Sequence, residues 1–227
     1  MPENESIEKI LCQYYLKEGI GLNLTEWVFG QSRNPSGFWG RTMGRLMNLA
    51  HVPLYRRLCE EVPSGAGDQV LDIGCGGGKC ISLFAQSTPG VTVFGIDTSS
   101  EMIAMAEKIN RKFIEQGRVK LYEGSVSVLP FEDSCFDLVV ACESIHFWPD
   151  LEKDLDEVAR VLKPGGHFLV LNRYARNKKE AEKMKEHFSL LYPEDYRNVL
   201  ERAGFTVKKK ELIEGKGQLV VVGVICK

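Results

Sequence analysis

A glycine-rich segment and a nearby aspartate are the residues of this sequence best suited to binding a ligand. Residues 70–78 read Val-Leu-Asp-Ile-Gly-Cys-Gly-Gly-Gly, and Asp97 ends the next apolar run. A short buried strand that enters a glycine-rich turn, beside a second strand that ends in a carboxylate, is typical of a site for an adenosine-containing ligand. Asp97 can accept hydrogen bonds from both ribose hydroxyls through its two oxygens.

The spacing of these glycines favours S-adenosylmethionine (SAM) over a dinucleotide. A dinucleotide-binding turn needs glycines at its first, third and sixth positions. Counting from Gly74, the third position is Gly76, but the sixth is Lys79. Asp72 precedes the turn by two residues, and its carboxylate would attract the ammonium and sulfonium groups of SAM but repel a pyrophosphate. A tight strand–helix turn that holds no ligand is the alternative interpretation.

Several further stretches give the chain a resemblance to the class I SAM-dependent methyltransferases. Besides residues 70–78 they are Phe-Gly-Ile-Asp-Thr-Ser-Ser-Glu-Met at 94–102, Leu-Pro-Phe-Glu-Asp at 129–133 followed by Phe-Asp-Leu-Val-Val at 136–140, and Val-Leu-Lys-Pro-Gly-Gly at 161–166. The resemblance covers roughly residues 60–227. It implies a Rossmann-like, doubly wound α/β fold with a seven-stranded sheet whose last strand pair is antiparallel.

The resemblance also implies the residues that would bind SAM and its demethylated product, S-adenosyl-L-homocysteine (SAH). They are Asp72, Gly74, Cys75, Gly76, Asp97, Thr98, Met102, Ser125, Val126 and Cys142. Most of the family carries Gly-Asp-Ala after the third strand, whereas this chain carries Gly124-Ser-Val126. The Ser125 hydroxyl or the Val126 backbone would then contact the adenine amino group.

The segment Ala141–Trp148 follows the fourth expected strand, where the transferred methyl group should lie. Glu143 and His146 are its best acid–base candidates, because either could take a proton from an acceptor or orient it. Packing and support of the loop are the alternative roles for both residues. Phe147 is expected to form a wall of the pocket.

The same segment bears on the class of acceptor. Enzymes that methylate amino groups of nucleic-acid bases often carry Asn/Asp-Pro-Pro-aromatic here, and protein-arginine methyltransferases resemble each other in a pair of glutamates. This chain has neither pattern, and its only glutamate here is Glu143. We therefore expect methyl transfer from SAM to a small molecule by in-line displacement. The alternatives are a SAM-binding regulator or pseudo-enzyme, and an enzyme that uses SAM for a different reaction.

Residues 1–60 are expected to form a helical extension before a SAM-binding domain at residues 61–227. Apolar residues at positions 7, 10, 11, 14 and 15 share one helical face. As a lid, the extension would bring aromatic and polar side chains to the substrate. These are Tyr14, Tyr15, Trp27, Arg41, Asn48 and His51. Ordinary packing and capping roles are equally compatible with these residues.

The pattern of apolar runs, turns and caps predicts alternating strands and helices. The strands are expected at 69–73, 91–96, 118–122, 136–141, 167–172, 205–213 and 217–225, and the helices at 77–86, 99–115, 151–162 and 193–203. Thr98 and Glu101 have the spacing of a capping box at the start of the second helix. Lys163-Pro-Gly-Gly166 is expected to end the helix at 151–162 and to turn into the next strand.

The composition excludes several classes of partner. The 227 residues carry 29 basic and 31 acidic side chains, a net charge of −2, without a basic block that would indicate nucleic-acid binding. Seven cysteines without a Cys-x-x-Cys pair predict reduced thiols and no metal site. The polar N-terminus does not read as a signal peptide, and no apolar run approaches membrane-spanning length. We expect a cytoplasmic protein with a small-molecule substrate and neither membrane nor nucleic-acid partners, whose oligomeric state the sequence does not indicate.

Overall fold

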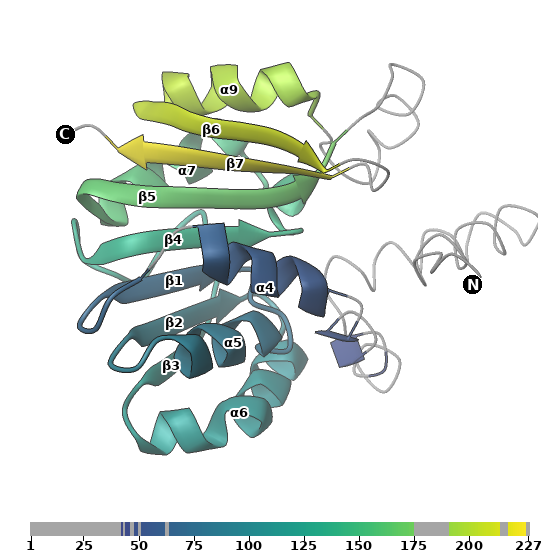
Figure 1. Cartoon of the computed structure of the whole chain (residues 1–227), viewed down its shortest axis with the longest axis vertical. Coiled ribbons are helices and arrows are strands. Elements are labelled where there is room, and N and C mark those ends of the chain that lie inside the picture. Colours follow the sequence, from purple (N-terminus) through teal and green to yellow (C-terminus); the bar gives the residue numbers. More distant parts are fainter. Residues whose placement is uncertain are drawn as a thin grey trace, which may run out of the picture.

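The chain, described by a computed structural model, forms one sheet with helices on both faces (Figure 1). The structure describes residues 42, 44, 45, 48, 49, 51–61, 64–174, 191–213 and 218–225. Most of the expected extension lies outside these residues. The same holds for four of the residues predicted to line the substrate pocket, which are Tyr14, Tyr15, Trp27 and Arg41.

In the described part of the chain, seven strands pair in the order β3-β2-β1-β4-β5-β7-β6. The five strands from β3 to β5 in this order run parallel, which confirms the predicted parallel α/β class. Strand β7 is antiparallel to both β5 and β6. The bounds are β1 Gln69–Ile73, β2 Thr92–Asp97, β3 Val119–Glu123, β4 Phe136–Cys142, β5 Leu162–Arg173, β6 Phe205–Ile213 and β7 Gln218–Ile225.

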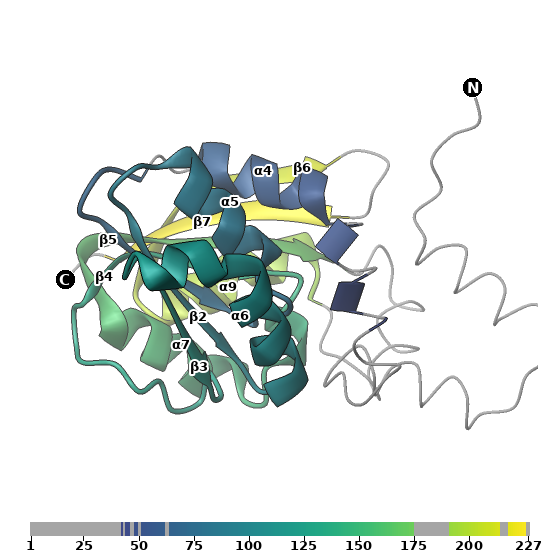
Figure 2. The same ribbon diagram turned by 90° about the horizontal axis from the view of Figure 1, so that it is seen from below.

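The helices form a layer on each face of the sheet (Figure 2). Helices α4, α5 and α6 pack on one face, and α7 and α9 pack on the other. One apolar core therefore lies on each side of the sheet. A short 3₁₀ helix, η1, follows β4. The bounds are α4 Val52–Glu61, α5 Lys79–Ser87, α6 Ser100–Glu115, η1 Ile145–Phe147, α7 Leu151–Val161 and α9 Pro193–Arg202.

Strand β1 contributes to both cores because side chains of a strand alternate between its faces. Leu71 and Ile73 belong to the core beneath α7 and α9, whereas Val70 belongs to the core beneath α4 and α5. Asp72 therefore faces the layer of α4 and α5. The strand ends at Ile73, and the glycine-rich turn begins at the next residue.

The start of α6 differs by one residue from the predicted capping box. The N-cap is Ser99, whose Oγ accepts a hydrogen bond from the backbone N–H of Met102 at 3.4 Å. A serine hydroxyl can cap a helix as well as a threonine hydroxyl, and the spacing alone does not separate the two neighbours. Thr98 is thereby left outside the cap, at the edge of the pocket described below.

The Lys163–Gly166 segment lies within β5 rather than before it. Phe136 of β4 pairs with Leu162 and Leu138 pairs with His167, so the four intervening residues of β5 bulge out of the ladder. Lys163 Nζ donates to both carboxylate oxygens of Asp137, at 2.8 and 2.7 Å. The predicted turn is therefore present as a bulge, and α7 ends directly before the strand.

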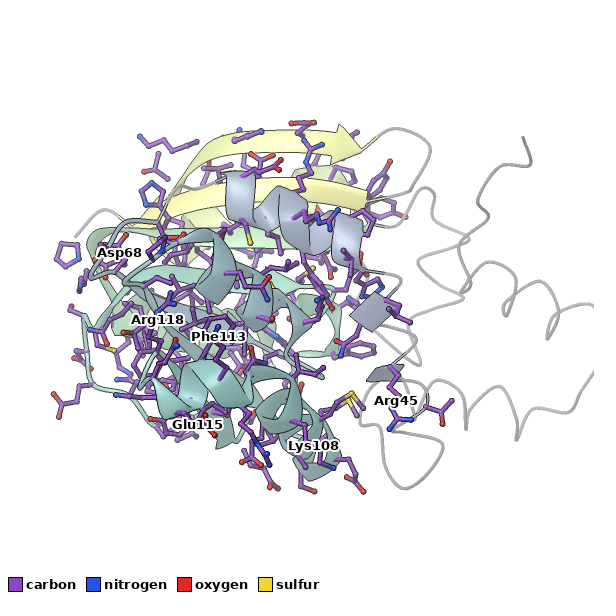
Figure 3. All side chains as sticks on the ribbon, turned by 60° about the horizontal axis from the view of Figure 1, so that its bottom comes forward. Arg45, Asp68, Lys108, Phe113, Glu115 and Arg118 are labelled. Atoms are coloured by element: carbon purple, nitrogen blue, oxygen red, sulfur yellow. The ribbon has the colours of Figure 1, made fainter. Side chains whose placement is uncertain are left out.

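Arg118 joins the start of β3 to the end of α5. Its Nη2 donates to the carbonyl oxygens of Ala85 and Thr88, at 2.7 Å each. Its guanidinium carbon lies 5.5 Å from the ring centroid of Phe113, and Figure 3 shows these two side chains as neighbours. A cation at the C-terminal end of a helix is favourable because the last carbonyls carry partial negative charge. This contact fixes α5, whose amino end follows the glycine-rich turn.

Four charged side chains connect α4 to β6. Arg57 Nη2 lies 2.5 Å from Glu211 Oε1, and Arg57 Nε lies 3.2 Å from Glu61 Oε1. Lys209 Nζ lies 2.6 Å from Glu61 Oε2 and 3.1 Å from Glu211 Oε2. We call these four residues the ion ring. It fastens the second half of α4 over the sheet.

Among the described residues, no helix combines the length and the apolar character needed to cross a membrane.

Candidate active site

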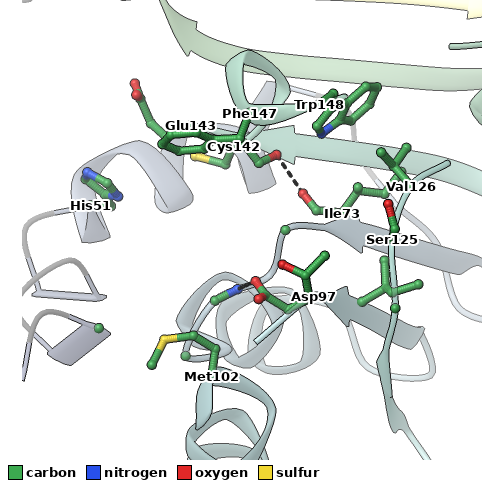
Figure 4. A pocket seen from close by; sticks show the side chains of 18 of the residues that line it. His51, Ile73, Asp97, Met102, Ser125, Val126, Cys142, Glu143, Phe147 and Trp148 are labelled. Carbon is green, nitrogen blue, oxygen red and sulfur yellow. Dashed lines mark hydrogen bonds between the residues drawn. The ribbon is translucent and has the colours of Figure 1, made fainter. Parts of the chain in front are cut away.

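A pocket of about 270 Å³ opens at the carboxyl ends of the parallel strands. Its walls come from the residues that follow β1, β2, β3 and β4, from the start of α6, and from the region at the start of α4 (Figure 4). This is the edge at which ligands bind in open parallel sheets. Twelve of the predicted site residues line it, namely Asn48, His51, Gly74, Gly76, Asp97, Thr98, Met102, Ser125, Val126, Cys142, Glu143 and Phe147.

Two glycines of the turn have distinct roles. Gly74 has φ +73°, and a Cβ there would lie 2.5 Å from the Cβ of Ser144, so the turn can pack against the loop after β4 only without a side chain. Gly76 has φ +51°, and a Cβ there would meet no atom within 4 Å. Because Gly76 lines the pocket, this open space allows a ligand to approach its backbone.

Asp97 connects the second strand, the glycine turn and α6. Its Oδ2 accepts from the backbone N–H of Gly76 at 2.8 Å, and its Oδ1 accepts from the backbone N–H of Ser99 at 2.9 Å. Burial raises the pKa of this carboxyl, and the two backbone N–H groups oppose the rise. Each carboxylate oxygen has a second lone pair, so Asp97 can also accept ribose hydroxyls. This geometry is compatible with the predicted ribose contact, and it also places the carboxylate at the start of α6.

Asp72 lies behind the wall of the pocket and is not among its lining residues. It is 1% exposed, and its Oδ2 has no hydrogen-bond partner among the described residues. Burial raises its pKa to about 7, and the negative charge of Asp97 adds to the rise. When ionised, the Asp72 carboxylate can attract a cationic ligand in the pocket electrostatically, but in this arrangement it does not contact the ligand directly.

Cys75 is likewise buried and outside the lining, although it lies in the turn. Its thiol approaches the carbonyl oxygen of Gly76 at 3.8 Å. Burial raises the pKa of the Cys75 thiol well above its usual value, so the group stays neutral. It acts here as a small packing group.

His146 is the main departure from the predicted site. It is buried and outside the lining of the pocket, and its Nδ1 lies 2.9 Å from Asn172 Oδ1. Asn172 Nδ2 in turn donates to the hydroxyl of Tyr196 at 2.7 Å, from α9. The 3₁₀ turn of η1 directs His146 toward β5, whereas Phe147 faces the pocket. This position is compatible with support of the loop, which was the alternative role.

Glu143 lies at the end of β4 with an unusual backbone. It has φ +53°, although it is not glycine, and its N–H donates to the carbonyl oxygen of Leu171 at 2.8 Å. Left-handed backbone at a residue with a side chain costs on the order of 1 kcal/mol or more and is frequent at functional sites. Glu143 is 7% exposed and lines the pocket.

Ser125 and Val126 border the pocket after β3. Ser125 Oγ donates to Ser127 Oγ at 3.3 Å and accepts from the backbone N–H of Ser127 at 3.2 Å. The hydroxyl is therefore engaged within its own turn. Of the two predicted adenine contacts, this arrangement favours the Val126 backbone.

Tyr55 and Trp148 also line the pocket, and Tyr55 was not among the predicted site residues. Tyr55 follows His51 by four residues, and the two rings meet edge to face with centroids 5.9 Å apart. The four-residue spacing is a signal that could have identified Tyr55, because such residues share a helix face. Trp148 stacks near Phe168 with centroids 6.1 Å apart.

These residues fit an adenosine-containing ligand. The open space at Gly76 allows a ligand to approach the protein backbone. Asp97 offers acceptors for hydroxyls, and Ile96 and Val126 offer apolar walls for a base. Within the described residues, no group of three or more His, Cys, Asp or Glu side chains has the arrangement of a metal site.

Comparisons with known proteins agree with this geometry. The sequence profile of a family described as a methyltransferase domain matches residues 71–170. The phthiotriol/phenolphthiotriol dimycocerosates methyltransferase of Mycobacterium tuberculosis is 35% identical over 121 residues, which are 53% of this chain and 43% of that protein. The O-methyltransferase resE of Aspergillus sclerotiorum is 30% identical over 179 residues, which are 75% of this chain and 67% of that protein.

A solved structure with a similar fold is the SAM-dependent methyltransferase from Aquifex aeolicus. It has a TM-score of 0.68 and 20% sequence identity, and the match covers 82% of this chain and 98% of that one. The chain spans less than half the length of the mycobacterial relative.

Replacing Asp97 by Ala should weaken both the fold and ligand binding. The substitution removes the acceptor of two backbone N–H groups, so the free energy of unfolding should fall by about 1–3 kcal/mol. The SAH dissociation constant should rise about 10- to 100-fold, because the hydroxyl contacts are lost as well. Calorimetric titration and urea unfolding measure the two effects. Asp156→Ala, at an exposed position of α7, is the control, and an unchanged SAH affinity in Asp97→Ala would remove this residue from the site.

Asp72→Asn should change how stability depends on pH. Because the pKa of folded Asp72 is about 7, well above its usual 3.8, the folded protein keeps a proton that the unfolded chain releases between about pH 4 and 7. Wild-type stability therefore falls as pH rises through this window, whereas asparagine does not titrate. The free energy of unfolding of the variant, relative to that of the wild type, should therefore rise by up to about 4 kcal/mol between pH 4 and pH 8, as measured by urea unfolding. A difference that stays constant across this range would contradict the assignment.

Proposed function

We propose that this chain, which belongs to the class I SAM-dependent methyltransferases, transfers a methyl group from SAM to a small-molecule acceptor. The observation that carries the proposal is the connection of Asp97 to the glycine turn beside the open space at Gly76. The names of both relatives describe methyl transfer, and one of them specifies phthiotriol and phenolphthiotriol dimycocerosates. SAM is the cofactor of this family.

Different residues around the pocket would bind different parts of the cofactor. Asp97 would accept the ribose hydroxyls, the backbone at Gly74 and Gly76 would lie against the amino-acid part, and Val126 would border the adenine. When bound, SAM supplies an electrophilic methyl carbon on a positively charged sulfur, so the difficult part of the chemistry comes with the cofactor.

The rest of the pocket would hold the acceptor in line with that methyl group. Phe147, Trp148 and Met102 supply apolar surface that excludes water, and Asn48 supplies a polar contact. Proximity and alignment alone can supply several kcal/mol of rate acceleration. Residues 1–60, most of which lie outside the described residues, are proposed to cover the acceptor as a lid.

His146 is proposed as a positioning residue in place of an acid–base residue. The contacts His146–Asn172 and Asn172–Tyr196 connect η1 to β5 and α9. Phe147 follows His146 directly, so the orientation of the histidine determines how the phenylalanine meets the acceptor. The two rings lie with centroids 4.1 Å apart.

SAM and SAH should each bind and stabilise the protein. At a concentration about 100 times the dissociation constant, a ligand adds about 2.7 kcal/mol to the free energy of unfolding. Thermal-shift and calorimetric titrations should therefore show a rise in Tm with SAM and with SAH, and none with NADH. Binding of NADH without binding of SAM would overturn the proposed cofactor.

Methyl transfer itself needs a separate measurement. With SAM labelled in its methyl group, label should move to at least one compound in a panel of small phenols, amines and thiols. SAM binding without transfer to any acceptor would favour a SAM-binding regulator, and consumption of SAM without a methylated product would favour a different reaction of the same cofactor.

A further inference from the structure

We propose that His51, assisted by Glu143, takes the proton from the heteroatom of the acceptor as it is methylated. The inference rests on the proposed methyl-transfer function, and it names the class of acceptor. That class is a phenol, amine or thiol whose reacting atom arrives with a proton, rather than a carbon nucleophile.

The first observation is the position of His51. It directly precedes α4, is 6% exposed, and lines the pocket. Its ring is held edge to face against Tyr55, one helical turn further along. A histidine that is buried from solvent but open to a ligand pocket is well placed for proton transfer, because an imidazole nitrogen can both accept and release a proton.

The second observation is that His51 and Glu143 share one side of the pocket. In Figure 4, both lie on the side opposite Ser125 and Val126, with Asp97 between the two sides. The Ser125 side is the adenine side in the proposed function, so the His51 side is left for the methyl group and the acceptor. The two residues reach it from separate elements, the start of α4 and the end of β4.

The third observation is the backbone of Glu143. Glu143 has a left-handed conformation at φ +53°, its N–H donates to the carbonyl oxygen of Leu171, and the residue lines the pocket at this point. Strain of this kind persists where the surrounding structure enforces it. A carboxylate in this cavity would stabilise an imidazolium that forms at His51.

The other titratable side chains that line the described pocket are unsuited to this role. Burial raises the pKa of the Tyr55 hydroxyl and of the Cys142 thiol well above their usual values, so both remain protonated. Asp97 already accepts two backbone N–H groups on the cofactor side. This leaves His51 and Glu143 as the pair able to receive a proton.

The proposed step conserves atoms and charge. The proton leaves the acceptor oxygen, nitrogen or sulfur for a ring nitrogen of His51, and the lone pair on that atom forms the bond to the methyl carbon. The carbon–sulfur bond breaks with its electron pair on sulfur, which leaves neutral SAH and an imidazolium on the same side of the pocket as Glu143. The imidazolium then returns its proton to water. No oxidant, reductant or metal is required.

Binding of 4-nitrophenol to the SAH complex tests proton acceptance without turnover. At a pH where free 4-nitrophenol is mostly un-ionised, the wild-type complex should convert bound probe to the phenolate, which is detected by its visible absorbance. His51→Gln should lose most of this signal and Glu143→Gln part of it, while SAH affinity stays within about twofold. His167→Gln, a half-buried histidine on β5, is the matched control and should behave like the wild type. Bound probe that stays un-ionised in the wild type, or equal phenolate signals in wild type and His51→Gln, would overturn the proposal.

Kinetics with two phenols separate proton transfer from packing. With phenol as acceptor, His51→Gln should lower kcat by about 10²–10⁴-fold, the usual size of a general-base contribution. With 4-nitrophenol at a pH where it is already ionised, the loss should shrink to less than about tenfold, whereas a structural defect would affect both acceptors equally. Glu143→Gln provides the same comparison if His51→Gln does not fold. A wild-type chain that binds SAH but methylates neither phenol, benzylamine nor thiophenol would overturn this inference and leave cofactor binding intact, whereas failure to bind SAH would overturn the proposed function itself.

Discussion

The contact between the Asp97 carboxylate and the backbone of the glycine turn is the interaction on which the site depends. One oxygen holds Gly76 and the other holds Ser99, so a single side chain sets the end of β2, the turn after β1 and the start of α6 relative to one another. The pocket lies among these three ends. A half-buried carboxylate tolerates this position because hydrogen bonds to the charged form offset much of the cost of its partial burial. The same bonds leave its remaining lone pairs directed by the fold before any ligand arrives.

The sequence predicted the parts of the molecule that local pattern determines. A buried apolar run followed by closely spaced glycines can hardly form anything other than a strand and a tight turn, and residues 69–73 form β1 as expected. The carboxylate of Asp97 could be placed at the same edge as Gly74, because parallel strands present their carboxyl ends together. The loop after β4 could be placed at the same edge for the same reason, since Glu143 follows the next strand in the sheet.

Which side chains face the pocket could not be predicted, because residue spacing does not specify how each turn and helix is oriented about its own axis. Whether His146 or Phe147 faces the pocket is decided by the 3₁₀ turn and by the partner that Asn172 offers, which lies 26 residues away in the chain. Asp72 is buried and outside the pocket lining, and recognising this requires knowing how the helices pack on the face of the sheet that it shares with Val70. His51 could be suspected as a pocket residue from its place among apolar neighbours. That it lies on the same side of the pocket as Glu143 depends on how α4 packs over the sheet, which the spacing does not specify.

Strand β6 ends the sheet, and its outer side therefore offers backbone groups to which another molecule could add a strand. Lys209 and Glu211 lie two residues apart on this strand, and both are engaged by Arg57 and Glu61 in the ion ring. An incoming strand would have to lie beside these charges or draw them away from their partners, at a cost that apolar side chains would not impose. The arrangement that fastens α4 thus also makes the addition of a further strand at this edge of the sheet less favourable, so the packing of the helix and the character of the edge depend on the same four side chains.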